Sequence, residues 1–209
     1  AEFTEKMQSL GISIDWDQTY QTISPEVKRI SQLSFLDLHD QGREYRQRAP
    51  AIWCPECETA ISQVETEDDE QPSHFHDIAF EIVETGGDVP DGEAAETFTI
   101  STTRPELLPA CVAVFVHPDD DENAYLVGGE ARIPLFDQTV PILEDERVDM
   151  ETGSGVVMCC TFGDQTDIEW YQAHDLDLRI AIDESGTLTD VAGEYEGLSS
   201  EAAREAIVE

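Results

Sequence analysis

The spacing of apolar residues changes near position 51, and this change divides the chain into two differently built parts. Before it, Ser24 and Pro25 form a helix cap followed by a first-turn proline, and apolar residues then recur at near-helical intervals. After it, apolar residues alternate over short stretches, as at Ile78, Phe80 and Ile82. We therefore predict a helical lead-in over residues 1–50 and a body of short strands over residues 51–209.

The body has strand patterns at several places, and turn-forming segments rich in glycine or aspartate separate them. The predicted strands cover 78–82, 98–100, 112–116, 156–160 and 178–182. A short helix is predicted over Gln165–His174, and Ser199 or Ser200 can cap a terminal helix. The predicted fold class is mixed α/β: a β-barrel-like, mainly antiparallel body with peripheral helices.

The chain carries 47 acidic and 11 basic residues, which gives a formal net charge of -36. This excess is spread along the chain and does not form one tail. A diffuse acidic coat favours adaptation to molar salt over a specific basic partner, because self-repulsion is screened there within a Debye length of about 3 Å. The apolar fraction of 40% allows a packed core and argues against general disorder.

No apolar run approaches the length of a membrane span, so no membrane partner is expected. Five cysteines without secretory context favour a reducing cytoplasm over a disulfide framework. The first residue is not methionine and the last lies inside a helical pattern, so we expect a fragment cut at both ends.

A glycine turn and a polar loop flank one predicted strand. Gly153-Ser154-Gly155 precedes the apolar run 156–160, and the loop after it carries Asp164 and Asp167. A buried strand would fix the position of this loop, and the loop would carry the chemistry. Glycine turns and acidic loops are common, so this segment alone also fits an ordinary surface loop.

The segment Thr102-Thr103-Arg104-Pro105 is the second polar stretch, at the end of the predicted strand 98–100. Its proline cannot join a strand ladder and pushes Arg104 into an extended conformation, with hydrogen-bond donors facing outward. By itself this pattern also fits an ordinary strand-to-turn junction.

Together the two segments resemble the editing domain inserted in class I tRNA synthetases for valine, isoleucine and leucine. That family carries a Thr-Thr-Arg-Pro segment and then a Gly-Thr-Gly strand that ends in a loop with an aspartate. The matching stretches here are 102–106 and 153–167, and residues 53–61, 102–114 and 161–164 are similar to the archaeal-type valine branch. The resemblance extends over nearly the whole chain.

The resemblance implies an aminoacyl-tRNA ester hydrolase that removes threonine from mischarged tRNA(Val). A site built for valine cannot strongly exclude threonine, in which a hydroxyl replaces a methyl, so a second site must hydrolyse the wrong ester. The family implies that Asp164 binds the threonine hydroxyl and Asp167 its ammonium. It implies that Thr102, Thr103 and Arg104 orient the ester, the terminal adenosine or an attacking water. Gly155 is a further substrate-binding residue that it implies.

The implied partners are the acceptor end of tRNA(Val) carrying threonine and the body of the parent synthetase. No cofactor is implied for the hydrolysis. The chain lacks the ATP-site motifs of class I synthetases, so we expect no amino-acid activation from it. Cys54 and Cys57 have the spacing of half a zinc site, for which the family supplies a second Cys-x-x-Cys elsewhere. His74 and His76 are local candidates for the missing ligands.

Two other functions stay open. The isoleucine branch of the family clears valine, but Asp164 and the sequence Glu106-Leu107-Leu108-Pro109 argue against it. A non-catalytic insertion that docks tRNA or braces the parent enzyme is the other alternative, and the presence of both aspartates argues against that. The chain also has Met158 where many bacterial members have lysine, and Gly163 where they have histidine. These differences concern the contacts to the terminal nucleotide.

Overall fold

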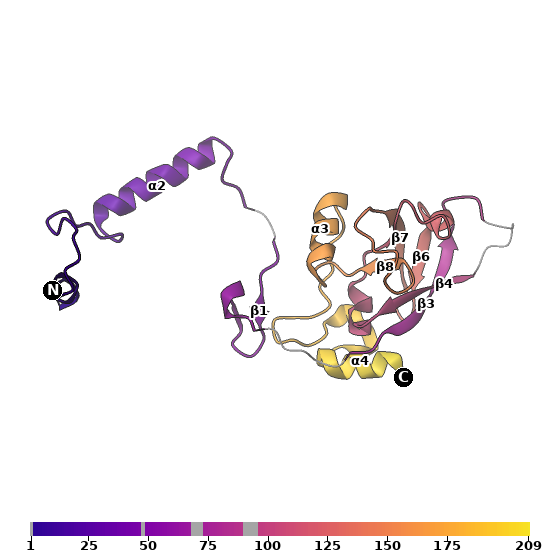
Figure 1. The fold of residues 1–209 in the computed structure, drawn as a ribbon. Helices are drawn as coiled ribbons and strands as arrows, with labels where there is room; N and C mark the ends of the chain where they lie inside the picture. The colour runs from indigo at the N-terminus through magenta and orange to yellow at the C-terminus, as the bar shows by residue number, and fades with distance from the viewer. Residues whose placement is uncertain (1, 47–48, 68–72, 90–95) are drawn as a thin grey trace. The chain divides into compact units, whose positions relative to one another are not determined.

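The computed structural model describes residues 2–46, 49–67, 73–89 and 96–209, and the chain forms two compact units, 1–49 and 50–209 (Figure 1). The first unit contains helices α1 (Glu2–Ser9) and α2 (Pro25–Asp40). Ser24 Oγ accepts a hydrogen bond of 3.3 Å from the Val27 N–H, and the left-handed Gly42 (φ 70°) follows the helix. The predicted helix and its cap are confirmed.

The second unit is built on a six-stranded sheet with the order β4-β3-β6-β7-β5-β8. All neighbouring strands are antiparallel except β5 and β7, which run parallel. The strands are β3 (His76–Glu84), β4 (Thr97–Thr102), β5 (Ala113–Val116), β6 (Glu130–Ile133), β7 (Gln138–Glu144) and β8 (Val156–Cys159). The mixed, mainly antiparallel fold class is confirmed.

The two edge strands of this sheet, β4 and β8, pack against each other, although no ladder pairs them in the described residues. The sheet therefore curls into a nearly closed, barrel-like body, and we call the contact between its edges the seam. Gly153 lies at the seam with a φ of 63°, and a Cβ there would lie 3.0 Å from Cβ of Ser101 in β4. Both the backbone conformation and the close approach favour glycine.

Strand β5 is buried on both faces of the sheet. Val114 and Val116 belong to the main core, whereas Ala113 and Phe115 belong to a second, smaller core, because successive side chains of a strand point to opposite faces. Helix α3 (Gln165–His174) covers the smaller core, where the Trp170 ring stacks on Phe115 with centroids 4.4 Å apart. Helix α3, which has the predicted bounds, is thereby fixed to the sheet.

Helix α4 (Ser200–Val208) packs into the main core through Ala203, which is fully buried. Ser199 is its cap, because Ser199 Oγ accepts a hydrogen bond from the Ala202 N–H. In the described residues no helix is long and apolar enough to cross a membrane. The remaining elements are the hairpin of β1 (Trp53–Cys54) and β2 (Thr59–Ala60) and the 3₁₀ helices η1 (Gln63–Glu65), η3 (Pro105–Ala110), η4 (Ala124–Leu126) and η5 (Asp190–Tyr195).

The strand predicted over 178–182 is wrong. This segment makes a single bridge, between Ile182 and Leu188, and is otherwise irregular. Side-chain hydroxyls occupy backbone groups that a strand ladder would need: the Arg179 N–H donates to Thr161 Oγ1, and Thr189 Oγ1 donates to the Ile180 carbonyl. Backbone groups that are hydrogen-bonded to side chains in this way are not available for strand pairing.

Candidate active site

The loop between β8 and α3 places two carboxylates beside each other. Asp164 is the cap of α3, and its Oδ1 accepts a hydrogen bond of 2.9 Å from the Asp167 N–H. This cap fixes the first turn of the helix and holds Asp167 next to Asp164. Asp164 is exposed, and no described residue donates a hydrogen bond to its second oxygen, Oδ2. That oxygen is therefore available to a ligand.

Asp167 is buried, with 6% of its surface exposed. Burial, followed by the negative charge of Asp164, raises the pKa of Asp167 to about 6, although hydrogen bonds from Cys159 and Cys160 oppose this shift. In the described part of the chain no arginine, lysine or histidine forms an ion pair with this carboxylate. A buried carboxylate that lacks a cationic partner and lines a cavity is suited to bind a cation from a ligand.

Arg104 joins residues 102–105, which we call the threonine segment, to the loop that carries Asp164 and Asp167, which we call the acidic loop. Its backbone N–H donates to Thr102 Oγ1 (3.1 Å), and its Nη1 donates to the carbonyl of Gly163 (2.8 Å). Its Nε lies 3.4 Å from Oε1 of Glu106. Two of the guanidinium nitrogens of Arg104 are therefore used within the protein, so this residue holds the two segments together. The sequence-based hypothesis assigned Arg104 only to substrate.

A cavity of about 460 Å³ lies between these segments. The predicted residues that line it are Thr102, Thr103, Arg104, Asp164 and Asp167. Gly155 does not line it: this glycine has a φ of 74° in the turn before β8, and a Cβ there would lie 3.3 Å from the carboxylate of Asp120. The turn that leads into β8 thus explains why residue 155 is a glycine.

The cavity also has a wall that the sequence reasoning missed, formed by the loop between β7 and β8. Arg147, Asp149 and Thr152 line it, and Thr152 Oγ1 donates to Asp149 Oδ2 at 2.7 Å. Arg147 Nη1 contacts the Asp145 carboxylate at 2.8 Å. Burial would raise the pKa of Asp145, but hydrogen bonds from His174 and Arg147 outweigh it and lower the pKa to about 2. These residues precede the turn at Gly153 in the sequence, and this position is the feature from which they could have been predicted to line the cavity.

The hairpin of β1 and β2 carries the two predicted zinc ligands. The Cys57 N–H points at Cys54 Sγ, 3.4 Å away, and lowers the pKa of the Cys54 thiol. Such a hydrogen bond to sulfur fits a thiolate ligand. In the described residues neither His74 nor His76 completes a group of three or more potential ligands with these cysteines. The described residues of this region therefore supply at most half of a tetrahedral set.

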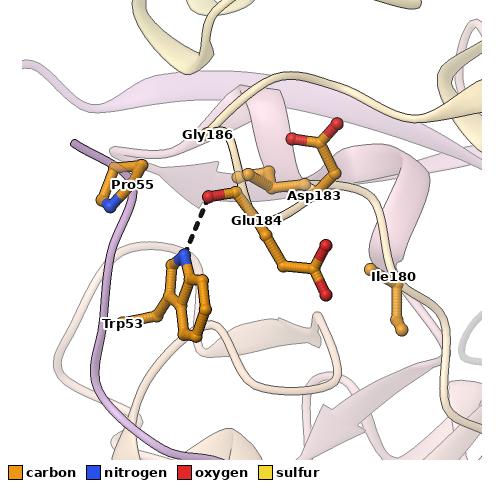
Figure 2. Close-up of a pocket in the computed structure, with 7 residues that line it drawn as sticks. Trp53, Pro55, Ile180, Asp183, Glu184 and Gly186 are labelled. Atoms are coloured by element: carbon orange, nitrogen blue, oxygen red, sulfur yellow. Dashed lines mark hydrogen bonds between the residues drawn. The ribbon is translucent and has the colours of Figure 1, made fainter. Parts of the chain in front are cut away.

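A second cavity, of about 600 Å³, lies between this hairpin and residues 180–186 (Figure 2). Figure 2 shows the indole of Trp53 donating a hydrogen bond of 2.8 Å to the Glu184 carbonyl. All the lining residues are apolar or acidic, with Pro55, Ile180 and Ile182 among them. This described lining has no hydroxyl, arginine, lysine or histidine side chain beside its carboxylates, so we assign the chemistry to the first cavity.

The chain is similar to known proteins along its whole length. It is 74% identical over 208 residues to the valine--tRNA ligase of Haloarcula marismortui, covering 100% of this chain and 23% of that protein. It is 47% identical over 204 residues to the valine--tRNA ligase of Methanocaldococcus jannaschii, covering 98% of this chain and 22% of that protein. The chain thus spans less than a quarter of the length of these relatives.

Among solved structures, the LeuRS–tRNA–LeuAMS ternary complex of Agrobacterium radiobacter K84 matches 98% of this chain and 33% of that chain, with 19% identity and a TM-score of 0.45. The family model of tRNA synthetases class I (I, L, M and V) matches residues 1–188. Because that match covers most of the sequence, the chain belongs to the class I tRNA synthetases of the I, L, M and V group.

Proposed function

We propose that the second unit is an editing domain that hydrolyses threonine from mischarged tRNA(Val). The proposal rests on Asp167, a buried carboxylate without a cationic partner in the described residues, at the wall of a cavity that Asp164 and Thr102 also line. Synthetic sites of valine enzymes are known to reject threonine by only about 10²-fold. The relatives named valine--tRNA ligase support a need for this correction.

Recognition of threonine follows from the chemistry of the two carboxylates. Asp167, when ionised, accepts hydrogen bonds only, and the ammonium group of an aminoacyl ester donates three. Such charge-assisted hydrogen bonds are the stronger kind. Oδ2 of Asp164 accepts the threonine hydroxyl, while Oδ1 remains the cap of α3. Valine has a methyl in place of that hydroxyl, which would displace water from Oδ2 without supplying a donor.

Hydrolysis then requires a positioned water. With the ammonium held at Asp167, the ester carbonyl lies in one place, where the hydroxyls of Thr102 and Thr103 orient it or the attacking water. Water adds to the carbonyl carbon, and the bond from that carbon to the ribose oxygen breaks. Threonine leaves as the free acid, and the ribose oxygen takes up a proton. This route uses no covalent intermediate on the protein.

The acceptor end of tRNA(Val) and the remainder of a longer synthetase are the proposed partners. Because the formal net charge is -36, contacts to phosphates are unfavourable, and recognition centres on the aminoacyl end. Cys54 and Cys57 are proposed as two ligands of a structural zinc whose other ligands lie outside this region. That zinc would brace the hairpin and take no part in hydrolysis.

A deacylation assay in molar KCl tests the function. We expect the chain to hydrolyse Thr-tRNA(Val) faster than Val-tRNA(Val), with spontaneous hydrolysis subtracted. Faster loss of valine would favour the isoleucine-type specificity instead. Binding of tRNA without any hydrolysis above the spontaneous rate would favour a non-catalytic docking module.

The proposed role of Asp167 predicts a bell-shaped pH profile. Asp167 must be ionised to bind an ammonium, and burial together with Asp164 raises its pKa to about 6. The α-ammonium of the substrate loses its proton near pH 8, at about the α-amino pKa. We expect kcat/KM to fall below about pH 6 and again above about pH 8. Single-turnover deacylation across this range measures it, and an acid limb that stays flat to about pH 4 would contradict the role.

The acid limb should not come from unfolding. A carboxyl whose pKa is raised in the folded state binds its proton more tightly there than in the unfolded chain. Through Asp167, the free energy of unfolding therefore falls as the pH rises from about 4 to about 6, and protonation of this group stabilises the fold. Circular dichroism over the same pH range provides the control.

A further inference from the structure

Glu106, in η3, is a carboxylate with no exposed surface, held between two arginines. Arg204 of α4 approaches it with Nε at 2.9 Å from Oε2 and Nη2 at 2.7 Å from Oε1, so it binds both oxygens. Arg104 approaches Oε1 with its Nε at 3.4 Å. Burial would raise the pKa of Glu106, but hydrogen bonds from Arg204 and from its own backbone N–H, together with the charges of Arg204 and Arg104, outweigh it and lower the pKa below the usual value. Glu106 is therefore a buried anion with two cationic partners.

The same arginine, Arg104, also reaches the acidic loop. Its Nη1 donates to the carbonyl of Gly163 at 2.8 Å, and Gly163 is the residue directly before Asp164. A Cβ at Gly163 would run into the carboxylate of Asp167. The position of Gly163 thus determines where both loop carboxylates lie, and Arg104 is the contact that holds it from the threonine segment.

The donors of Arg104 are shared between two acceptors of unequal strength. A buried carboxylate attracts a guanidinium much more strongly than a carbonyl does. With Arg204 present, both oxygens of Glu106 already have close donors. Nη1 of Arg104 therefore stays hydrogen-bonded to the carbonyl of Gly163. Without Arg204, Glu106 has Arg104 as its only cation among the described residues, and the guanidinium would turn towards it and leave the carbonyl.

We propose that Arg204 is a positioning residue for the cavity: by satisfying Glu106, it keeps Arg104 on Gly163 and so keeps Asp164 and Asp167 in their binding positions. This inference rests on the proposed function for the role of the two aspartates. It extends the site to a residue of the last helix, which does not line the cavity.

The test uses Arg204→Gln in the 209-residue chain, with Arg132→Gln as the matched control. Arg132 is 41% exposed and paired with Glu81, while Arg204 is 40% exposed, and Arg132 does not line the cavity. The ligand is 3'-deoxy-3'-threonylamino-adenosine, a stable amide, titrated calorimetrically in molar KCl. We expect Arg204→Gln to weaken binding about tenfold, the effect of about one charged hydrogen bond, and Arg132→Gln to leave it unchanged.

A double variant separates positioning from general stability. In Arg204→Gln/Glu106→Gln the carboxylate that attracts Arg104 is also removed, so Arg104 should return to Gly163 and binding should recover towards the wild-type value. Because neutralising Glu106 also relieves an unpaired buried charge, thermal unfolding is measured in parallel. If Arg204 served only to stabilise the fold, binding at a temperature where every variant is fully folded would be the same in all of them. Wild-type affinity in Arg204→Gln, or no recovery in the double variant, would overturn the inference.

A ligand-free measurement keeps this inference separate from the proposed function. The Asp167 N–H donates to Asp164 Oδ1, so its amide hydrogen exchange reports the order of the loop. We expect exchange to be faster in Arg204→Gln and to slow again in the double variant. If the wild-type chain fails to bind the threonyl compound, the proposed function is wrong, and the exchange rates alone still decide the role of Arg204.

Discussion

Asp167→Asn is expected to lower kcat/KM for Thr-tRNA(Val) by about 10²- to 10³-fold, or about 3–4 kcal/mol, as when one partner of a buried charge pair is removed. The substitution preserves the shape of the side chain and removes the charge that would hold the ammonium. The fold should not suffer, because burial disfavours the charged form of Asp167 and raises its pKa to about 6. Single-turnover deacylation and thermal unfolding in molar KCl measure the two effects.

Asp177→Asn is the matched control for the loss of one negative charge. Asp177 is exposed and lies outside the cavity lining, so its variant should deacylate at the wild-type rate. If Asp167→Asn deacylated Thr-tRNA(Val) at the wild-type rate, Asp167 would not bind the ammonium and the proposed function would lose its main support. A large drop in its melting temperature would instead assign a structural role to the carboxylate.

Asp164→Ser is expected to remove most of the preference for threonine without weakening helix α3. Serine is as good a helix cap as aspartate, so its hydroxyl can still accept the Asp167 N–H, whereas the second oxygen is lost. Loss of a hydrogen bond to a charged group costs about 1.5–3 kcal/mol, or about 10- to 10²-fold in the hydrolysis of Thr-tRNA(Val). Hydrolysis of Val-tRNA(Val) should change little, so the ratio of the two rates is the measurement.

Asp164→Ala separates the cap from the recognition of the hydroxyl. It should show the same loss of threonine preference and also lose about 1 kcal/mol of stability, because alanine cannot cap α3. Both variants remove a charge that raises the pKa of Asp167, so the acid limb of the pH profile should move to lower pH. An unchanged threonine preference in Asp164→Ser would show that another group reads the hydroxyl.

The strands that could be predicted from the sequence are those with apolar alternation, such as β3 and β4. Strands β6 and β7 were not predicted, because two of the four residues of β6 are charged and β7 contains Pro141, which is unfavourable in a strand pattern. The segment 178–182 has the composition of a strand, but its backbone groups are bound by the hydroxyls of Thr161 and Thr189. That competition depends on residues distant in sequence.

The candidate site was predictable to a similar degree. The resemblance to the editing-domain family marked Thr102, Asp164 and Asp167, and the structure brings them to one cavity. The function of Arg104 as a link was not predictable, because the contact joins residues 59 positions apart. The partner Arg204 lies 98 positions from Glu106, and neither composition nor periodicity relates them.

The position of the cavity at the seam affects how the site can adapt to its substrate. The threonine segment follows β4 and the acidic loop follows β8, which are the first and last strands in the order of the sheet. Since no ladder joins these edges in the described residues, the gap between them can widen or narrow without breaking a strand-to-strand hydrogen bond. Side-chain contacts such as Arg104 with Gly163 therefore join the two edges at the cavity. For the proposed hydrolysis, this means that the acceptor end of tRNA would enter the cavity without disrupting the sheet.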